Sequence, residues 1–367
     1  MEFLVPLLVI SYIVFILSVF AFKPVKKAPQ QGGILLSDVA FVIPTYIGDI
    51  QKLPALINDL VIHTPAEAEI IVVLNGTDDE IVQKQFLPNS EKFKIITLKE
   101  AHKKKAILLG ANQTNKEYIW LMDADLRLNA QVDLNRILKS ISYSDLCIFP
   151  LSQSSDPKLD IKNSKSWLAL LLNWEWTYLQ VLTLHHRNSK RSVLANAANL
   201  LVKRSLLFEG AGPYQGNMHI GSGDDIFLLQ HAKALDKEIF LYPGSSFAWT
   251  AFPKNLKQAF RQRLRWATKN YQLQGLDFAL GKLLFAIRFF LPFLLLVSPS
   301  LINITALGIL LIFEALYLIK PRGLKSWLQH LLSALLLPLF YVPILFLSLR
   351  QSFSQTRSAV SELPKSA

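Results

Sequence analysis

The sequence predicts an α/β protein with a mainly parallel sheet, placed between apolar segments near both ends of the chain. Three observations predict it. Short apolar runs alternate with longer helix-like stretches between about residues 33 and 274. The alternation is regular, which is typical of βαβ units. The apolar fraction, 51% of 367 residues, is high enough to indicate membrane segments as well.

Five short runs are predicted to be buried strands, and the stretches between them to be helices or partial helices. The strand runs are VAFVIP (39–44), EIIVVL (69–74), FKIITL (93–98), YIWLM (118–122) and DLCIFPL (145–151). The helical stretches are 49–63, 80–87, 101–114 and 130–141. Ligands of such sheets bind beyond the carboxyl ends of the strands, so we expect the site in the loops that follow them.

The N-terminal apolar stretch is predicted to be a membrane anchor. Phe3 to Phe22 carries no charge and is long enough to cross a hydrocarbon core of roughly 30 Å. Glu2 and the lack of a small-residue cleavage site favour an uncleaved anchor over a signal peptide. Lys23, Lys26 and Lys27 follow it, so the next part of the chain is expected in the cytoplasm.

Three further apolar blocks lie near Leu283–Ser298, Leu301–Ile319 and Leu328–Leu349. Arg288 interrupts the first block, which is either a tilted span or an interfacial helix. The basic segment Lys320–Lys325 indicates a cytoplasmic loop. We therefore expect about four spans in a bacterial inner or plasma membrane, with the orientation of the C-terminus open.

The net charge limits the classes of binding partner, and the cysteine count limits the possible disulfides. The net charge of +12 fits contact with anionic lipid or with a polyanionic substrate such as a nucleotide. No DNA- or RNA-binding motif accompanies the charge, so nucleic acid is not predicted as a partner. Cys147 is the single cysteine, which excludes an intrachain disulfide.

Two aspartates follow the strand predicted at 118–122. Asp123 and Asp125 are i and i+2 of an extended chain, so their side chains can reach one point. Two ionised carboxylates so close need a cation, and Mg²⁺ takes one or two carboxylates together with phosphate oxygens. A solvated turn with capping aspartates would give the same pattern, so this pair alone is a weak signal.

Two later segments strengthen the signal of a functional site. Asp224 and Asp225 follow a glycine-rich stretch, where helix capping by Asp224 is the simpler explanation. Gln262, Arg265 and Trp266 stand at i, i+3 and i+4, on one face of a predicted helix. That helix is basic and amphipathic, which is also typical of a helix on a membrane surface.

In this order the motifs resemble the family 2 glycosyltransferases with a GT-A fold, particularly the membrane-embedded branch with cellulose, chitin and hyaluronan synthases. The matching stretches are FVIPTY, VVLNGTDDE, KKKAILLG, DAD, GDD and QRLRW, the last fitting a Q-x-x-R-W pattern. The resemblance spans about residues 38–269. It implies a GT-A, Rossmann-like mixed sheet, mainly parallel and flanked by helices, with transmembrane helices at both ends.

The resemblance also implies a division of the chain into five parts. A transmembrane anchor at 1–24 precedes a cytoplasmic glycosyltransferase domain at 33–250. An amphipathic interfacial helix with Q-x-x-R-W follows at 251–276. About three transmembrane helices at 277–350 and a polar tail at 351–367 complete it.

Roles follow from the resemblance residue by residue. It implies donor contacts for Pro44, Thr45, Tyr46, Asn75, Asp79, Lys103 and Asp123. Lys105 is the alternative to Lys103 for a phosphate contact. Asp125, with Asp123, is implied to bind a divalent metal, Mg²⁺ or Mn²⁺, on the diphosphate.

On the acceptor side, the resemblance implies Asp225 as the general base, with Asp224 beside it. It implies that Gln262, Arg265 and Trp266 shape the acceptor and diphosphate end. Two departures touch the nucleotide loops: Ile47-Gly48 replaces the usual Asn-Glu, and Leu74-Asn75 stands where Asp usually begins the second loop. The identity of the base is therefore open, with UDP as the family expectation.

The leading hypothesis is a membrane glycosyltransferase that moves a sugar from a nucleotide-diphosphate sugar to a lipid-linked or glycan hydroxyl, with inversion. A processive polysaccharide synthase is the alternative, although three C-terminal spans make a channel within one chain marginal. A non-catalytic nucleotide-sugar-binding subunit and a transporter with a regulatory domain are less favoured. The helix predicted from residue 166, with Glu175 in its apolar middle, is either a core helix or a wall for the acceptor. The oligomeric state is open.

Overall fold

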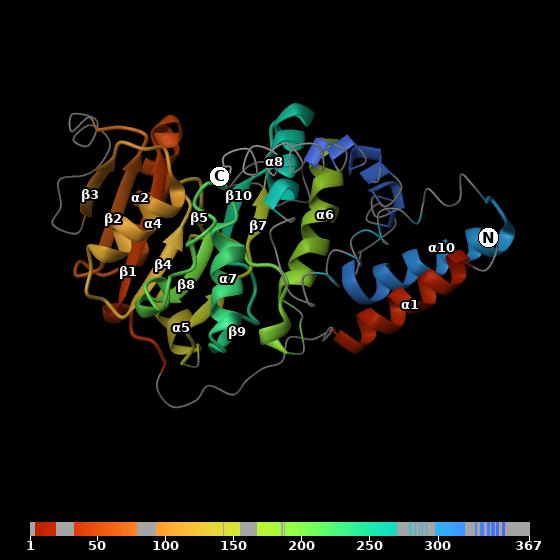
Figure 1. The fold of residues 1–367 in the computed structure, drawn as a ribbon, viewed down its shortest axis with the longest axis horizontal. Helices are drawn as coiled ribbons and strands as arrows, with labels where there is room; N and C mark the ends of the chain where they lie inside the picture. The colour runs from red at the N-terminus through yellow and green to blue at the C-terminus, as the bar shows by residue number, and fades with distance from the viewer. Residues whose placement is uncertain are drawn as a thin grey trace, which may run out of the picture. The chain divides into compact units, whose positions relative to one another are not determined.

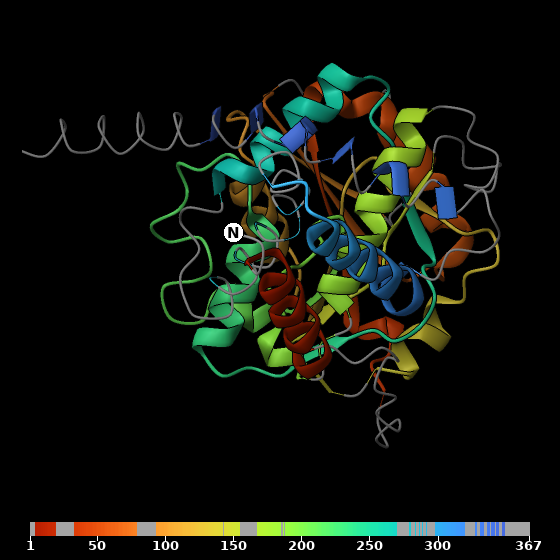
Figure 2. The ribbon, with the colours of Figure 1, turned by 90° about the vertical axis from the view of Figure 1, so that its right-hand side faces the viewer.

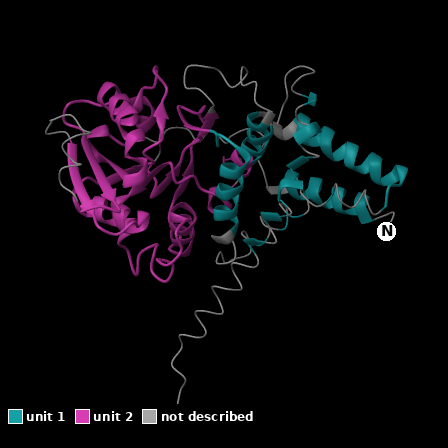
Figure 3. Cartoon of the chain, turned by 90° about the horizontal axis from the view of Figure 1, so that it is seen from above, with its two compact units in different colours: residues 1–22, 164–178, 252–367 teal, residues 23–163, 179–251 magenta. Residues whose placement is uncertain are grey.

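The computed structural model describes residues 4–19, 33–78, 93–141, 143–154, 167–184, 186, 188–269 and 298–319, with single residues between 279 and 348. The chain divides into two compact units, which Figure 3 colours separately. The first comprises residues 1–22, 164–178 and 252–367, and the second 23–163 and 179–251. Each unit is described by itself.

The second unit contains a seven-stranded sheet with the order β3-β2-β1-β4-β8-β6-β9 (Figure 1). Its strands are β1 (Val39–Tyr46), β2 (Glu69–Asn75), β3 (Phe93–Leu98), β4 (Tyr118–Met122), β6 (Leu146–Ile148), β8 (Asn199–Lys203) and β9 (Ile239–Leu241). All neighbours are parallel except β8, which runs antiparallel to β4 and β6. The five predicted runs all form strands, so the mixed, mainly parallel sheet is confirmed.

The described α-helices of this unit are α2 (Leu53–His63), α4 (Lys103–Asn112), α5 (Leu134–Lys139), α7 (Asp224–Ala234) and the last part of α6 (Trp167–Leu184). The described 3₁₀ helices are η1 (Leu36–Asp38), η2 (Ile47–Lys52), η4 (Ser189–Arg191) and η5 (Arg204–Leu207). Helix α4 packs closely on β1 and β2. A Cβ at Gly110 would lie 2.6 Å from Cγ1 of Val42 and 3.1 Å from Cγ2 of Val73. This helix therefore needs a glycine where it crosses the sheet. The helix predicted at 80–87 lies outside the described residues.

Trp120 of β4 forms the centre of the core. Its ring is fully buried and stacks on Phe41 and Phe149, with centroids 5.5 Å and 5.0 Å away. Its Nε1 donates a hydrogen bond to Oδ1 of Asn199 at 2.8 Å, which satisfies its buried N–H. The strand that leads into Asp123 is therefore rigidly held.

A smaller three-stranded sheet has the order β5-β10-β7, formed by β5 (Arg127–Leu128), β10 (Ala248–Ala251) and β7 (Ser152–Ser154). Asp59 of α2 accepts hydrogen bonds from Arg127 Nε at 2.7 Å and Nη2 at 2.9 Å. Its Oδ2 also accepts from the Leu128 N–H at 2.9 Å. This bidentate pair fixes β5, and with it the turn that carries Asp125.

The first unit is helical in its described part. It contains α1 (Leu4–Val19), the first part of α6 (Trp167–Leu184), α8 (Leu256–Lys269) and α10 (Leu301–Phe313), which continues as the π-helix η7 (Glu314–Ile319). Helices α1 and α10 lie side by side (Figures 1 and 2). The hydroxyl of Tyr12 on α1 donates to Oε1 of Glu314 at 3.3 Å, and Arg288 Nε lies 2.5 Å from that same oxygen.

Within the described residues, no helix combines the length and the apolar character needed to cross a membrane. The apolar block predicted at 301–319 is helical throughout. The blocks predicted at 3–22, 283–298 and 328–349 extend into residues outside the described ranges. The interfacial segment predicted at 251–276 is helical only from Leu256, since Ala251 ends β10, and its last residues lie outside the described ranges. The tail predicted at 351–367 lies wholly outside them.

Candidate active site

The nucleotide-contact residues predicted after the first two strands lie at the carboxyl ends of β1 and β2. Tyr46 ends β1 and pairs in register with Asn75, which ends β2. Thr45 and Asn75 are buried, whereas Tyr46 is 50% exposed. Pro44 is buried within β1 and pairs with Val73. Asp79 lies outside the described residues.

The Tyr46 ring lies between two glycines. A Cβ at Gly48 would lie 2.6 Å from its Cε1, and one at Gly76 would lie 3.0 Å from its Cε2. Gly76 also has a φ of +88°, which disfavours a side chain. The two loops thus hold a half-exposed aromatic ring whose surface suits stacking against a planar group.

Lys103 joins the two acidic motifs. Its Nζ lies 2.6 Å from Oδ1 of Asp123 and 2.9 Å from Oδ2 of Asp224. Burial acts to lower the pKa of Lys103, but the charges of the two carboxylates outweigh it, so this pKa is raised. Burial also raises the pKa of Asp123, and Lys103 opposes that shift. A lysine and two carboxylates thus form one connected cluster.

The second acidic pair opens helix α7. Gly223 is the N-cap, with a φ of +88°, so Asp224 is the first helical residue and not the cap considered from the sequence. Asp225 accepts hydrogen bonds from the Ile226 N–H at 2.8 Å and from the Ala197 N–H at 3.3 Å. Both carboxylates lie in the first turn of the helix, at the positive end of the helix dipole.

Asp125 is held separately from Asp123. A turn closes through the hydrogen bond from the Leu126 N–H to the Asp123 carbonyl, at 3.0 Å. Beyond it, the Thr250 hydroxyl of β10 donates to Oδ2 of Asp125 at 3.2 Å. Asp123 and Asp125 therefore contact different partners, Lys103 and Thr250.

The described residues contain no group of three or more His, Cys, Asp or Glu side chains arranged to hold a metal ion. Two aspartates from one turn nevertheless offer hard oxygen donors. Mg²⁺ is commonly bound by one or two carboxylates, with its other ligands from water and substrate phosphates. The donor set at Asp123 and Asp125 fits a cation of that kind.

Lys104 is a residue that the sequence prediction missed. It is 2% exposed, and its Nζ donates to the Asn217 carbonyl at 2.6 Å, to Asn217 Oδ1 at 3.0 Å and to the Ile220 carbonyl at 2.9 Å. The same ammonium lies 4.6 Å from the centroid of the Phe227 ring. Lys104 therefore fixes the glycine-rich loop that precedes Asp224.

The lysines of the KKK run have three different roles. Lys103 contacts carboxylates, Lys104 points into the loop, and Lys105 pairs with the exposed Glu100. A signal for Lys104 was present in the sequence, because it shares the buried face of α4 with Ile107 and Ala111, at i+3 and i+7.

Gln262, Arg265 and Trp266 lie on α8, in the first unit. Arg265 is exposed, and the other two are half-buried. The predicted helix is confirmed over Leu256–Lys269.

Replacing Lys104 with Met is expected to loosen residues 210–223, because the partly buried carbonyls of Asn217 and Ile220 would lose their donor. Such a loss costs about 1–3 kcal/mol. Hydrogen–deuterium exchange should become faster across that loop. Lys105→Met is the matched control and should leave exchange there unchanged. Equal protection of the loop in both variants would show that Lys104 does not hold it.

Comparisons of the sequence and of the fold identify similar proteins. Residues 40–206 match the family described as Glycosyl transferase family 2. A mannosyltransferase from Pyrobaculum calidifontis, in complex with GDP-Man and Mn²⁺, is 14% identical with a TM-score of 0.51, over 100% of this chain and 96% of that one.

TarS of S. aureus is also similar. Its 1–349 fragment in complex with UDP-GlcNAc is 16% identical with a TM-score of 0.39, over 85% of this chain and 91% of the fragment. The chain spans only 40% of the longer TarS structure, at 15% identity and a TM-score of 0.40. No curated protein matches the sequence. Residues 40–206 thus match a glycosyl transferase family 2 domain, and this match together with the GT-A-like sheet supports a glycosyltransferase.

Proposed function

We propose that this enzyme transfers a sugar from a nucleotide-diphosphate sugar to a hydroxyl of a lipid-linked or glycan acceptor, with inversion and with a divalent cation. The observation that carries the proposal is the contact of Lys103 with both Asp123 and Asp224. It joins the turn after β4, where a donor would bind, to the start of α7, where a base would act. Sugar transfer requires the donor and the acceptor to meet at one place, which this contact provides.

Asp225 is the proposed general base. Two backbone N–H groups, from Ile226 and Ala197, orient its carboxylate. The acceptor oxygen attacks the anomeric carbon from the face opposite the diphosphate while Asp225 takes the hydroxyl proton. The bond from that carbon to the diphosphate oxygen breaks, and the nucleoside diphosphate leaves with the bonding electron pair. One displacement of this kind inverts the anomeric centre.

Asp125 and Asp123 are the residues proposed to hold the cation. When bound, Mg²⁺ or Mn²⁺ would neutralise charge on the leaving diphosphate. Thr250 orients Asp125 through its hydroxyl. The Pyrobaculum calidifontis mannosyltransferase is in complex with GDP-Man and Mn²⁺, which supports a nucleotide sugar and a divalent cation as ligands.

The donor is tested directly by incubating the purified protein with UDP- and GDP-sugars and Mn²⁺ or Mg²⁺ and measuring the nucleotide released. Release from one donor is expected. The length of the glycan product on a gel separates single transfer from processive synthesis, the second candidate from the sequence.

Membrane association is part of the proposal. Helix α1 carries no charged residue, and Leu7, Ile10 and Val14 of this helix are 60–61% exposed. Exposed apolar residues in such a row are costly in water and suit contact with lipid. We propose a multi-pass membrane protein with its glycosyltransferase domain in the cytoplasm.

Asp225→Asn should lower kcat by about 10²–10⁴-fold, since the amide cannot take the acceptor proton. Turnover with the donor found in the panel is the measurement. Asp236→Asn is the matched control, because the exposed side chain of Asp236 pairs with Lys190. Near-normal turnover by Asp225→Asn would refute the role of this residue.

Asp125→Ala should raise the concentration of Mn²⁺ needed for half-maximal turnover, because a carboxylate ligand is lost. Metal titration after treatment with a chelator measures it, with Asp236→Asn again as the control. The metal role is wrong if the Asp125→Ala protein works equally well with and without a divalent cation.

The full chain should stay in the membrane fraction after alkaline carbonate extraction. Lysine at Leu7, Ile10 and Val14 together should reduce the retained fraction, because charge in the hydrocarbon core costs about 2.5–3.5 kcal/mol per residue. Lysine at the exposed Val61 and Ile62 of α2 is the matched control. Release of the unmodified chain by carbonate would contradict the proposal.

A further inference from the structure

A buried carboxylate in an apolar helix has no role in the mechanism above. Glu175 lies within α6 (WLALLLNWEWTYLQVLTL) and is fully buried. An ionised carboxylate in such surroundings is costly unless it is paired. Its partners therefore indicate why it is there.

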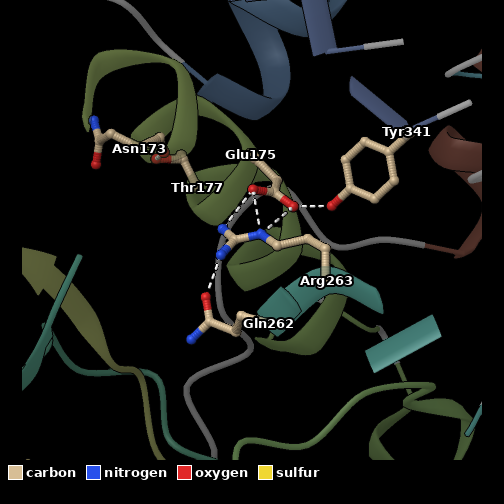
Figure 4. Close-up of polar contacts among 6 residues, drawn as sticks. All are labelled: Asn173, Glu175, Thr177, Gln262, Arg263 and Tyr341. Atoms are coloured by element: carbon tan, nitrogen blue, oxygen red, sulfur yellow. Dashed lines mark hydrogen bonds and ion pairs between the residues drawn. The ribbon is translucent and has the colours of Figure 1, made fainter. Parts of the chain in front are cut away.

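Arg263 of α8 is the main partner (Figure 4). Its Nη2 lies 2.6 Å from Oε2 of Glu175, and its Nε lies 3.1 Å and 3.2 Å from the two carboxylate oxygens. Both side chains are 1% exposed. Tyr341 donates a further hydrogen bond to Oε1 of Glu175. The carboxylate is thus held by three donor groups, and the guanidinium is held in one plane.

The guanidinium of Arg263 also contacts two residues of the Q-x-x-R-W motif. Nη1 donates to Oε1 of Gln262, and the guanidinium carbon lies 4.7 Å from the centre of the Trp266 ring. Trp176, the residue after Glu175, lies 6.5 Å from Trp266 between ring centres. One side chain therefore binds Glu175 with one edge, Gln262 with another and the Trp266 ring with its face. Only arginine has the planar fork that this requires.

We propose that Glu175 and Arg263 are positioning residues that orient Gln262 and Trp266 for the acceptor and diphosphate end of the transfer. The inference rests on the proposed function and on the substrate role that the family resemblance implies for those two motif residues. It also assigns a role to Glu175: the carboxylate fixes the plane of the guanidinium, and the guanidinium fixes two side chains of the motif.

A purely structural ion pair makes a different prediction. Breaking a buried pair by removing one partner destabilises the fold, whereas replacing both partners with uncharged groups of similar size is often neutral. The double substitution Glu175→Gln/Arg263→Met removes both charges, keeps an acceptor for Tyr341 and removes the guanidinium. It therefore separates folding from positioning.

The experiment uses the full chain in vesicles of total bacterial lipid extract, which supplies acceptor hydroxyls. The measurements are thermal unfolding, binding of UDP and GDP with Mn²⁺, and nucleotide release from UDP-N-acetylglucosamine and GDP-mannose. The variants are Glu175→Gln, Arg263→Met, their combination and Arg263→Lys. Arg261→Met, at an exposed position of the same helix, is the matched control.

A fluorine NMR spectrum of protein labelled with 5-fluorotryptophan adds a readout that needs no substrate. The resonance of Trp266 is assigned by its loss in Trp266→Phe. Positioning predicts that this resonance broadens or splits in Glu175→Gln, where Arg263 remains but loses its anchor.

The double variant is expected to unfold at the temperature of the wild type and to bind nucleotide with an affinity within about twofold of it. Its turnover, measured as nucleotide released from the donor sugar, should be about 10²-fold slower. Arg263→Lys keeps the charge but not the fork, so it should fold and remain slow. A double variant that recovers both stability and turnover, or an unchanged Trp266 resonance in Glu175→Gln, would overturn the inference. If the wild type releases no nucleotide from any donor, the proposed function fails, and the inference with it.

Discussion

The two ion pairs of Lys103 hold together loops that are far apart in the sequence. Asp123 and Asp224 carry like charges, and carboxylates this close to one point repel each other unless a cation lies between them. Lys103 supplies that cation from the first turn of α4. The positive charge of this lysine therefore helps the candidate donor and base segments to share one site.

The fold around the cluster serves to place that lysine. Helix α4 is held against the sheet at Gly110, where a side chain would collide with Val42. Lys104, the residue after Lys103, binds the loop ahead of α7. The strand on the other side of the cluster is fixed by the buried Trp120. Each carboxylate thus comes from a segment with its own rigid support, which is how proteins keep charged groups in a functional geometry.

Sequence patterns predicted the central strands because each is a buried run bounded by polar loops, and they predicted the acidic residues that follow them. Strand β8 was missed, since NLLVK is too short for its periodicity to distinguish a strand, and its antiparallel direction depends on partners distant in the chain. The loop contacts of Lys104 and the pairing of Glu175 with Arg263 were missed for a related reason. A buried charge is recognised from its partner, and tertiary structure alone brings that partner into contact.

A double-mutant cycle on Lys103 and Asp224 measures whether this lysine couples the start of α7 to the rest of the site. The free energy of unfolding is measured for the wild type, Lys103→Met, Asp224→Asn and the double variant. A coupling energy of about 0.5–3 kcal/mol is expected, because each single substitution removes the ion pair between the two residues. Costs that add to within about 0.5 kcal/mol would mean that the two residues act independently and that Lys103 does not join the two segments.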